Sequence, residues 1–237
     1  MPKPSPQEQA KIYAAKGALP YVHRHMTIGL GTGSTASHFI KFLGELNKVH
    51  KLKLKCIATS KDTEKKARAA GLKVVGLDAI ETIDLAVDGA DVATPNFTLL
   101  KGLGGALTRE KIIAYRAKKL VVLVNEGKMR DELEGAVAIE VLPFALPLVY
   151  REMKKFSHKA SIRKKNGRPY LTDNSNNIID LPLRIINPGG MELALNSIPG
   201  VVENGIFTKA DIIVIGTSTG YKRLKKGHPP HEAKIRR

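Results

Sequence analysis

The sequence predicts an α/β fold: a Rossmann-like, mostly parallel sheet with helices on both faces, plus a smaller α+β domain of the ferredoxin-like type. Predicted strands and helices alternate along the first half of the chain. Those strands are continuous apolar runs, which is typical of a parallel sheet covered on both faces. After about Asp131 the predicted order becomes β-α-β-β-α-β, the order of the ferredoxin-like unit.

The first helix is marked by a start signal, in which Ser5 can cap, Pro6 suits the first helical position and Glu8 can complete a capping box. Apolar residues then recur at helical spacing. The next predicted elements alternate, with strands at 26–30, 52–58, 73–75, 83–87 and 120–124 and helices at 34–46, 60–70 and 108–118.

The second half of the chain has a different pattern. Its predicted elements are strands at 136–141, 161–163, 170–181 (broken by a turn at 173–176), 201–206 and 211–215, and helices at 144–156 and 188–197. We expect a Rossmann-like catalytic domain of residues 1–131 plus 207–237, with an inserted α+β domain of residues 132–206.

Composition narrows the class of protein. The single cysteine, Cys56, excludes an internal disulfide framework and suits a reducing compartment. Its apolar neighbours indicate a buried structural thiol rather than a nucleophile. No apolar run approaches the roughly 20 residues that span a bilayer, and no signal core precedes the first helix. We therefore expect a cytoplasmic protein without membrane contact.

The net charge of +17 favours anionic partners in general. Much of it lies in short lysine runs and in the basic tail, residues 221–237. We interpret the charge as solvated lysines on helix faces plus a loose basic tail. Nucleic-acid binding is not expected as the main function, because the sequence has no helix-turn-helix, zinc-finger or aromatic RNA-binding pattern.

A glycine-rich loop follows the first predicted strand. Gly31-x-Gly33-x-x-Ala36 satisfies the loose dinucleotide fingerprint. A dinucleotide site also needs an acid at the end of the next strand, but that strand ends in Ala58-Thr59-Ser60, and Asp62 suits the first turn of a helix. The loop therefore predicts a general anion site at a helix N-terminus, with hydroxyls from Thr32, Ser34 and Thr35. A tight turn with no ligand is the alternative.

Two aspartates, Asp88 and Asp91, follow the strand at 83–87. They can converge on one ligand, or each can cap a turn.

A second flexible loop, Lys101-Gly102-Leu103-Gly104-Gly105, precedes the helix that begins near Thr108. Lys101 can supply a cation to a developing oxyanion. Glu110 falls in the first helical turn, where it can act as a base or merely compensate the helix dipole.

Taken together, these groups suit proton abstraction next to a carbonyl. They lie at the carboxyl ends of strands in one predicted sheet, and Lys128 follows another of those strands. These groups include no cofactor site, so no cofactor is expected. A metal is not expected either, because His228 and His231 have no third convergent ligand.

These stretches resemble ribose-5-phosphate isomerase of the A type over essentially the whole chain. The matching segments are GLGTGST (29–35), DGAD (88–91), KGLGGALTREKI (101–112), the strand before Lys128, and LTDNSNNIIDL (171–181). The resemblance implies cofactor-free interconversion of ribose 5-phosphate and ribulose 5-phosphate through an enediolate, in the non-oxidative pentose phosphate pathway. It also implies a cytoplasmic homodimer or homotetramer.

The resemblance also assigns roles by position. Glu110 corresponds to the general base, Lys101 to the lysine beside the enediolate oxygen, and Asp88 and Asp91 to acids that assist ring opening and hydroxyl proton transfer. The implied substrate-binding residues are Thr32, Gly33, Ser34, Thr35, Asp88, Gly89, Ala90, Asp91, Lys101, Gly102, Leu103, Gly104 and Lys128. Lys11 in the first helix is a further candidate for the phosphate.

The sequence departs from the family pattern at Val92, at Leu103 and in Asn125–Gly127 before Lys128. None of these departures removes a proposed catalytic group. Two other functions remain open at this point: an amino-sugar phosphate isomerase-deaminase, and a non-enzymatic sugar-phosphate sensor or nucleic-acid binder.

Overall fold

A computed structural model describes residues 4–233 of the chain, with side chains for residues 4–227. The chain packs into two compact units. Unit 1 comprises Met1–Ala90, Ile112–Met129 and Lys209–Arg237, and unit 2 comprises Asp91–Lys111 and Arg130–Thr208. The segment 91–111, which the sequence places in the first domain, therefore packs with the residues of the second.

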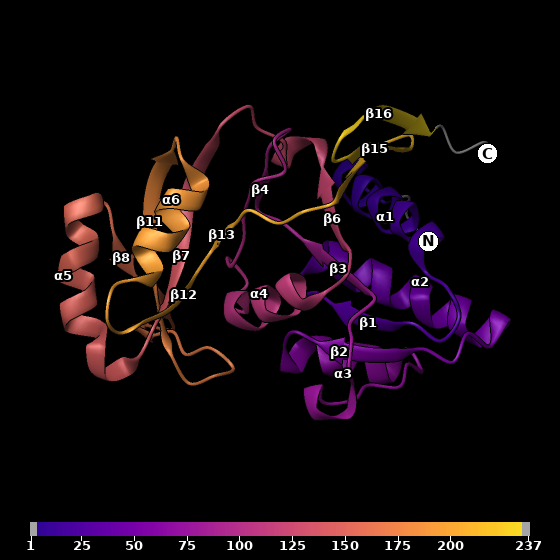
Figure 1. Cartoon of the computed structure of the whole chain (residues 1–237), viewed down its shortest axis with the longest axis horizontal. Coiled ribbons are helices and arrows are strands. Elements are labelled where there is room, and N and C mark those ends of the chain that lie inside the picture. The colour runs from indigo at the N-terminus through magenta and orange to yellow at the C-terminus, as the bar shows by residue number, and fades with distance from the viewer. Residues whose placement is uncertain (1–3, 234–237) are drawn as a thin grey trace. The chain divides into compact units, whose positions relative to one another are not determined.

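Unit 1 is built on a seven-stranded sheet, whose strands β2, β1, β3 and β6 lie side by side in Figure 1. The sheet order is β16-β15-β14-β6-β3-β1-β2. Strands β2, β1, β3, β6 and β14 pair in parallel, and β15 and β16 add an antiparallel edge. The bounds are β1 Thr27–Leu30, β2 Lys55–Ala58, β3 Leu85–Gly89, β6 Leu120–Asn125, β14 Ile212–Gly216, β15 Tyr221–Lys225 and β16 His228–Ala233.

Helices cover both faces of this sheet. The longer helices of the chain's first half are α1 Pro6–Ala18, α2 Ser34–His50, α3 Lys61–Ala69 and α4 Leu107–Arg116, and short 3-10 turns occupy Leu19–Tyr21, Leu77–Ala79 and Glu126–Lys128. Ala14 of α1, Phe39 of α2 and Ala67 of α3 share one core with Ile28 and Leu30 of β1. A Cβ on Gly29, which faces the other way, would lie 2.3 Å from Ile113, so the second half of α4 covers the opposite face.

The predicted start signal of α1 is confirmed, because the Ser5 hydroxyl accepts a hydrogen bond from the Glu8 amide and Pro6 opens the helix. The Cys56 side chain lies in the core, and burial raises the pKa of its thiol to about 12. A thiol with so high a pKa is a poor nucleophile, as the sequence predicts.

Two predictions for this unit were wrong. The strand predicted at 73–75 is reduced to a single bridge between Val74 and Cys56. The basic tail was expected to be loose, but residues 221–233 form the hairpin β15–β16, which pairs with β14 through Gly216 and Tyr221. A hairpin on β14 shields an otherwise open sheet edge.

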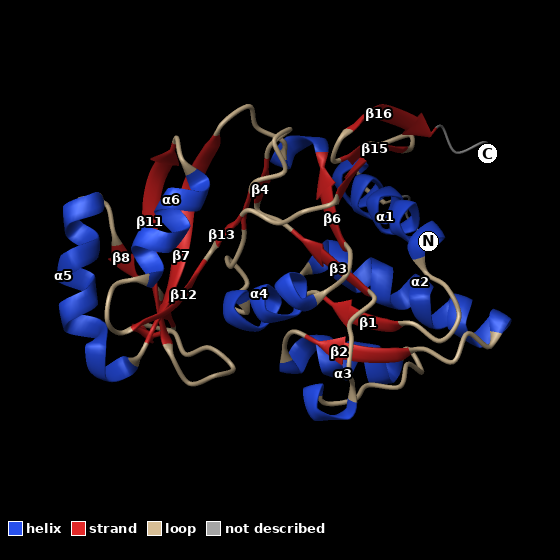
Figure 2. Ribbon diagram, in the orientation of Figure 1, coloured by secondary structure: helices blue, strands red, loops and turns tan. Residues whose placement is uncertain are grey.

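Unit 2 contains a four-stranded antiparallel sheet in the order β12-β7-β11-β8 (Figure 2). In this order β11 lies between β7 and β8, as in the split β-α-β arrangement of the predicted ferredoxin-like unit. The bounds are β7 Leu133–Val141, α5 Leu146–Phe156 after a 3-10 turn at Pro143–Ala145, β8 Ser161–Ile162, β11 Asn177–Ile185, α6 Pro188–Asn196 and β12 Val201–Asn204. The short strands β9 Lys164–Lys165 and β10 Arg168–Pro169 form a separate hairpin.

The two faces of the four-stranded sheet have different partners. Val137 and Ile139 of β7 pack in one core with Val149 of α5 and Leu195 of α6. Ala138, which points to the other face, packs with Leu107 at the start of α4. The alternation of side chains along β7 therefore assigns even-numbered residues to the face that meets α4.

A small three-stranded sheet, ordered β13-β5-β4, completes unit 2. Its strands are β4 Val92–Ala93, β5 Leu99–Leu100 and β13 Ile206–Phe207. No helix in the described part of the chain is long and apolar enough to span a bilayer.

Candidate active site

The carboxyl ends of β1 and β3 lie side by side in the sheet of unit 1, with Leu30 paired to Val87. The chain runs from β1 to β2 on one side, whereas β3 lies on the other side of β1. This reversal is a topological switch point, the position where open α/β sheets bind their ligands. The glycine loop, residues 31–35, follows β1 there, and Asp88 lies near the end of β3.

Asp88 is only 4% exposed, and its carboxylate is directed at the glycine loop. Its Oδ1 accepts hydrogen bonds from the Thr32 amide at 3.1 Å and from the Gly89 amide at 2.7 Å. A Cβ built on Gly31 would lie 1.9 Å from Asp88 Oδ1, so only glycine leaves room for this carboxylate. Asp88 therefore shapes the loop as well as offering an acid.

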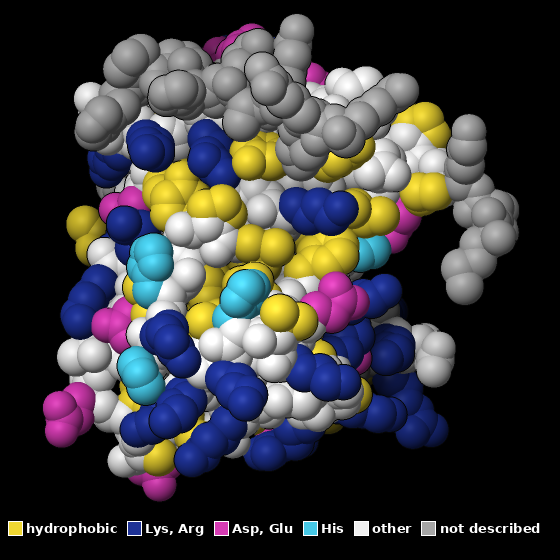
Figure 3. Space-filling view, turned by 90° about the vertical axis from the view of Figure 1, so that its right-hand side faces the viewer, with side chains coloured by type: hydrophobic (Ala, Val, Ile, Leu, Met, Phe, Trp, Pro, Cys, Tyr) yellow, Lys and Arg dark blue, Asp and Glu magenta, His cyan; other side chains and the backbone are white. Residues whose placement is uncertain are grey.

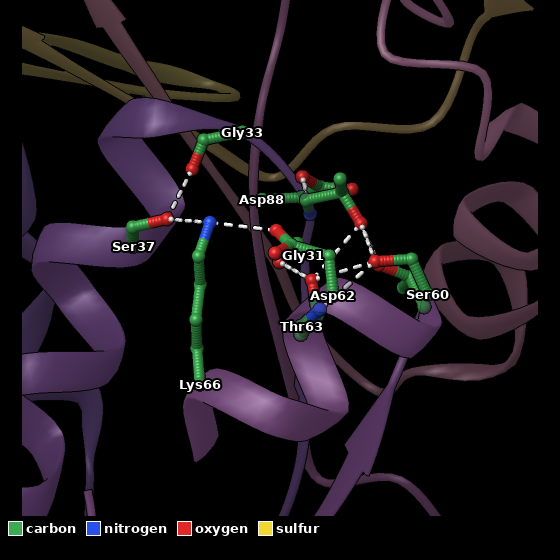
Figure 4. Close-up of polar contacts among 10 residues, drawn as sticks. Gly31, Gly33, Ser37, Ser60, Asp62, Thr63, Lys66 and Asp88 are labelled. Atoms are coloured by element: carbon green, nitrogen blue, oxygen red, sulfur yellow. Dashed lines mark hydrogen bonds and ion pairs between the residues drawn. The ribbon is translucent and has the colours of Figure 1, made fainter. Parts of the chain in front are cut away.

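The Thr32 hydroxyl belongs to a cluster of hydroxyls. Its Oγ1 lies 2.8 Å from Thr59 Oγ1, 2.9 Å from Ser60 Oγ and 3.0 Å from Thr63 Oγ1. Thr63 also donates to the Gly31 carbonyl at 3.0 Å (Figure 4). The residues that follow β2, where a dinucleotide site would need an acid, instead hold the glycine loop in place.

The first turn of α2 continues the loop. Gly33 precedes the helix with φ of 112°, a left-handed conformation that favours glycine, while Ser34 is exposed and Thr35 is buried. The first amides of a helix have no partner within the helix and carry its positive dipole end. Ser34 and Thr35 therefore occupy a position suited to an anion.

Lys66 of α3 reaches toward the same helix (Figure 4). Its Nζ lies 3.1 Å from Ser37 Oγ and 2.6 Å from Asp62 Oδ2. Asp62 is thus a first-turn residue paired with a lysine, as the sequence predicts, and is not a ribose-binding acid.

Two further lysines of unit 1 were candidates. Lys128 donates to the Ala90 carbonyl at 2.6 Å and so lies beside the DGAD segment. Lys11 is paired with Glu8 at 3.0 Å, and His38 contacts the other oxygen of that carboxylate. Hydrogen bonds from Lys11 and His38 hold the pKa of Glu8 below its usual value.

In unit 2, Lys101 and Glu110 form a buried ion pair. Lys101 Nζ lies 3.1 Å from Glu110 Oε2, and each side chain is 5% exposed. Lys101 Nζ also lies 5.4 Å from the centre of the Phe207 ring. Attraction between the opposite charges offsets part of the cost of burying them, and the pair places a base and a cation beside each other.

The segment between these residues is the lysine loop, residues 101–105. Asp91 Oδ2 accepts from the Leu103 amide at 3.0 Å, so Asp91 holds this loop from the other end of the β4–β5 hairpin. Gly102 and Gly105 have φ of 104° and 80°, and the Tyr170 ring packs where a Cβ on Gly105 would lie. Burial, and then Asp173, raises the pKa of Tyr170. The Leu103 side chain is 56% exposed, so it does not fill the loop.

Arg163 clamps the lysine loop from the four-stranded sheet. Its Nη1 donates to the Gly102 carbonyl at 2.8 Å and to the Leu103 carbonyl at 3.1 Å. Its Nε donates to Asp180 at 2.9 Å, and its second terminal nitrogen forms an ion pair with the same carboxylate. Arg163 was not among the predicted site residues, although its partner Asp180 lies in the matching stretch 171–181.

The family model described as ribose 5-phosphate isomerase A (phosphoriboisomerase A) matches residues 55–220. Ribose-5-phosphate isomerase A of Pyrococcus furiosus is 45% identical over 229 residues, covering 92% of this chain and 99% of the relative. The chain belongs to the ribose 5-phosphate isomerase A family.

Solved members of the family have the same fold. A D-ribose-5-phosphate isomerase in complex with phospho-erythronic acid is 45% identical, with a TM-score of 0.88 over 92% of this chain and 98% of that one. Ribose 5-phosphate isomerase A of Methanocaldococcus jannaschii is 41% identical, also with a TM-score of 0.88, over 92% of this chain and 99% of that one. The predicted α/β fold is thereby confirmed.

In this family member, each site residue suggested by sequence lies in a defined setting within its own unit. Thr32 to Thr35, Asp88 to Ala90 and Lys128 belong to unit 1, whereas Asp91, Lys101 to Gly104 and Glu110 belong to unit 2. The supporting groups Thr59, Thr63 and Arg163 were missed. Isolated hydroxyls and one arginine in a basic chain give no signal in sequence. The His228–His231 pair has side chains outside the described residues.

Proposed function

We propose that this chain interconverts D-ribose 5-phosphate and D-ribulose 5-phosphate as an aldose–ketose isomerase that uses no cofactor. The observation that carries this proposal is the buried Lys101–Glu110 pair, at 3.1 Å, in a chain of the ribose 5-phosphate isomerase A family. The pair supplies a carboxylate base and a cation, which are the groups that proton transfer next to a carbonyl requires.

The glycine loop of unit 1 is the proposed phosphate site. Ser34 and Thr35 lie in the first turn of α2, where backbone amides and the helix dipole favour an anion. The Thr32 hydroxyl is engaged by Thr59, Ser60 and Thr63, so Thr32 contributes chiefly through the position of its backbone. A solved relative in complex with phospho-erythronic acid supports a phosphorylated ligand.

The reaction begins with the open-chain aldehyde, which Asp88 and Asp91 help to form by moving hydroxyl protons. Glu110 then removes the proton on C2, and the electron pair forms the C1–C2 double bond while negative charge develops on O1. Asp88 and Asp91 assist the transfer of the proton from the C2 hydroxyl to O1. Glu110 returns its proton to C1, which leaves a ketone at C2. Atoms and charge balance without an external oxidant or reductant.

Lys101 stabilises the enediolate oxygen in this scheme. Its ammonium group lies in a buried setting against Glu110 and Phe207. A cation acts more strongly on a developing oxyanion where water is excluded. When Glu110 takes up a proton and becomes neutral, Lys101 loses its counter-charge just as the oxyanion forms.

The decisive experiment compares wild type with Glu110→Gln, using ribose 5-phosphate with and without EDTA. We expect turnover by the wild type in both conditions. For the variant we expect kcat to fall by about 10²- to 10⁴-fold with a smaller change in KM, the range typical of a lost general base. Circular dichroism checks that the variant is folded. Near wild-type kcat in Glu110→Gln would remove the assigned base, and EDTA-sensitive turnover would contradict the metal-free scheme.

We also propose that the chain self-associates, as a homodimer or homotetramer, and works in the cytoplasm. Unit 2 exposes Leu142, Phe144 and Leu148, which lie two and four positions apart along the chain and are 48%, 96% and 59% exposed. Apolar side chains gathered in this way mark an interaction surface. Light scattering after size-exclusion chromatography measures the assembly, and a monomer at micromolar concentration would contradict it.

A further inference from the structure

Glu110 lies near the start of α4, and its neighbours in the helix each form a hydrogen bond or an ion pair with another segment of unit 2. Thr108 Oγ1 donates to Glu140 Oε2 at 2.5 Å. Arg109 donates to the Asn174 side chain at 2.7 Å. Lys111 Nζ lies 2.9 Å from a carboxylate oxygen of Glu192 and 2.9 Å from one of Glu203. The backbone on both sides of Glu110 is therefore held by long-range contacts.

Glu140 is the most deeply buried of these partners, with no exposed surface. As an even-numbered residue of β7 it lies on the face that meets α4. Its Oε1 accepts from Thr172 Oγ1 at 2.8 Å, Asn174 Nδ2 at 3.1 Å and Asn176 Nδ2 at 2.9 Å. With Thr108 on Oε2, four neutral donors surround this carboxylate.

A buried carboxylate is costly unless its hydrogen bonds are satisfied. The turn at 172–176 satisfies them, because three of its side chains point at Glu140. This accounts for the stretch LTDNSNNIIDL, which the proposed reaction does not otherwise use. An apolar residue at 140 would need no such turn, but it could not accept a hydrogen bond from Thr108.

We propose that Glu140, through Thr108, is a positioning residue that fixes the first turn of α4 so that Glu110 is held at its working distance from Lys101. The proposal rests on the proposed function of Glu110. A base that is misplaced by about 1 Å can lose about 10²-fold in rate. The turn 172–176 acts on the same helix a second time, because Asn174 and the Asp173 carbonyl bind Arg109.

The test is Thr108→Val, which keeps the shape of the side chain and removes only its hydroxyl. We expect kcat to fall by about ten- to a hundredfold, with KM within about twofold of wild type. Thr108→Ser restores the donor and should restore most of kcat. The matched control is Thr94→Val. It removes a buried threonine hydroxyl of unit 2 that is hydrogen-bonded to Thr98 and not to α4. The control should lose stability but keep kcat.

Hydrogen–deuterium exchange of residues 107–111 supplies a readout that does not need turnover. We expect faster exchange there in Thr108→Val and wild-type exchange in Thr94→Val. Unchanged exchange, or wild-type kcat in Thr108→Val, would overturn the positioning role, as would equal losses of kcat in both variants. A wild-type protein with no ribose 5-phosphate turnover would instead overturn the proposed function, and the exchange data would still decide whether Thr108 holds the helix.

A second and independent observation concerns charge. Lys and Arg outnumber Asp and Glu by 15 in unit 1 but by only 2 in unit 2. Within unit 1, residues 41–73 hold ten cations, all exposed, against three acids. We name these cations the basic face; they are Lys41, Lys48, Lys51, Lys53, Lys55, Lys61, Lys65, Lys66, Arg68 and Lys73.

The basic face lies over α2, α3, the segment between them and the residues that follow α3 up to Lys73. Figure 3 shows Lys and Arg side chains gathered over the lower part of one side of the molecule, with few acidic side chains among them. Lys51, Lys53 and Lys55 are exposed, whereas Leu52 and Leu54 beside them are buried, so three lysines of one short segment face solvent. Within the face, Lys66 pairs with Asp62 and Arg68 pairs with Glu64.

We infer that the basic face binds the phosphate backbone of nucleic acid without reading sequence. Among exposed large apolar side chains of the described residues, only Val49 lies within 41–73, so the face has nothing substantial to insert into a membrane. It also has no exposed Phe, Tyr or Trp side chain on which bases could stack. Binding of this kind depends on phosphate contacts and weakens steeply with salt.

The test measures fluorescence anisotropy of a labelled DNA duplex of about 20 base pairs with wild type, with K48Q/K51Q/K53Q and with the control K159Q/K164Q/K165Q. The control removes the same charge from exposed lysines of unit 2. We expect the first variant to flatten the log Kd–log salt slope by about 2 to 3 and the control to leave it unchanged. Equal effects of both variants, no binding at 50 mM salt, or preference for phosphatidylserine vesicles would overturn the inference. Ribose 5-phosphate turnover should be unaffected in both variants.

Discussion

At the scale of single residues, Gly31 leaves the space that the Asp88 side chain occupies beside the glycine loop. A Cβ at this position would lie 1.9 Å from Asp88 Oδ1, 2.1 Å from its Cγ and 2.5 Å from its Cβ. The neighbouring atoms belong to a buried side chain that also accepts hydrogen bonds from the loop. Glycine is needed here for the close approach of an acid, not for an unusual backbone angle.

We therefore expect Gly31→Ala to displace Asp88 and to lower kcat/KM by at least about tenfold, with a loss of stability of about 1–3 kcal/mol from overpacking. Gly189→Ala is the control, since nothing lies within 4 Å of a Cβ there and the residue is in helix α6. Steady-state kinetics and urea unfolding measure both effects. Wild-type kinetics in Gly31→Ala would show that the position of Asp88 is unimportant for turnover.

At the scale of elements, Asp84 joins the beginning of β1 to the entrance of β3. Its Oδ2 accepts from the Thr27 amide at 2.9 Å, and its Oδ1 accepts from Lys118 Nζ at 2.8 Å. The hydrogen bond from Lys118, with help from Thr27, holds the pKa of Asp84 below the usual value of 3.8, although partial burial opposes the shift. The ionised carboxylate therefore stabilises this corner of the sheet.

The sign of the pH effect follows from the lowered pKa. The stabilisation is complete above the unfolded-state pKa of 3.8 and is lost as pH falls through the lower folded-state value. We expect Asp84→Asn to lower the free energy of unfolding by about 1–2 kcal/mol at pH 7, with a smaller difference from wild type at pH 3. Glu152→Gln, at an exposed pair with Lys155, should change little. Urea unfolding at both pH values measures this, and a pH-independent deficit would contradict the assignment.

Element prediction succeeded where the local pattern and the tertiary environment agree. The capped helix α1, the buried strand β6 and the helix α4 were all predicted near their observed bounds. The strand at 73–75 failed because only Val74 finds a partner on the edge strand β2. The hairpin β15–β16 was missed because its many charges mask the alternation of a strand, and only the open edge of β14 makes it a strand.

At the scale of the whole molecule, the two units differ in chemistry. Unit 1 carries nearly all of the +17 net charge together with the glycine loop, and unit 2 carries the buried Lys101–Glu110 pair. The domain boundary expected at residue 131 remains a prediction, while the packing groups residues 91–111 with unit 2. The small sheet β13-β5-β4 accounts for that grouping, because it pairs Leu100 with Ile206 from the far end of the inserted segment.

The sequence by itself determined the fold class and the main candidate groups, because parallel-strand patterning and the segments around Asp88, Lys101 and Glu110 are local in the chain. Only the tertiary structure decided which groups support them. Thr63 meets Gly31 across 32 residues, Arg163 reaches Gly102 across 61, and Glu140 meets Thr108 across 32. Such contacts depend on which sheet face a side chain occupies and on which elements pack there, and no local spacing encodes that.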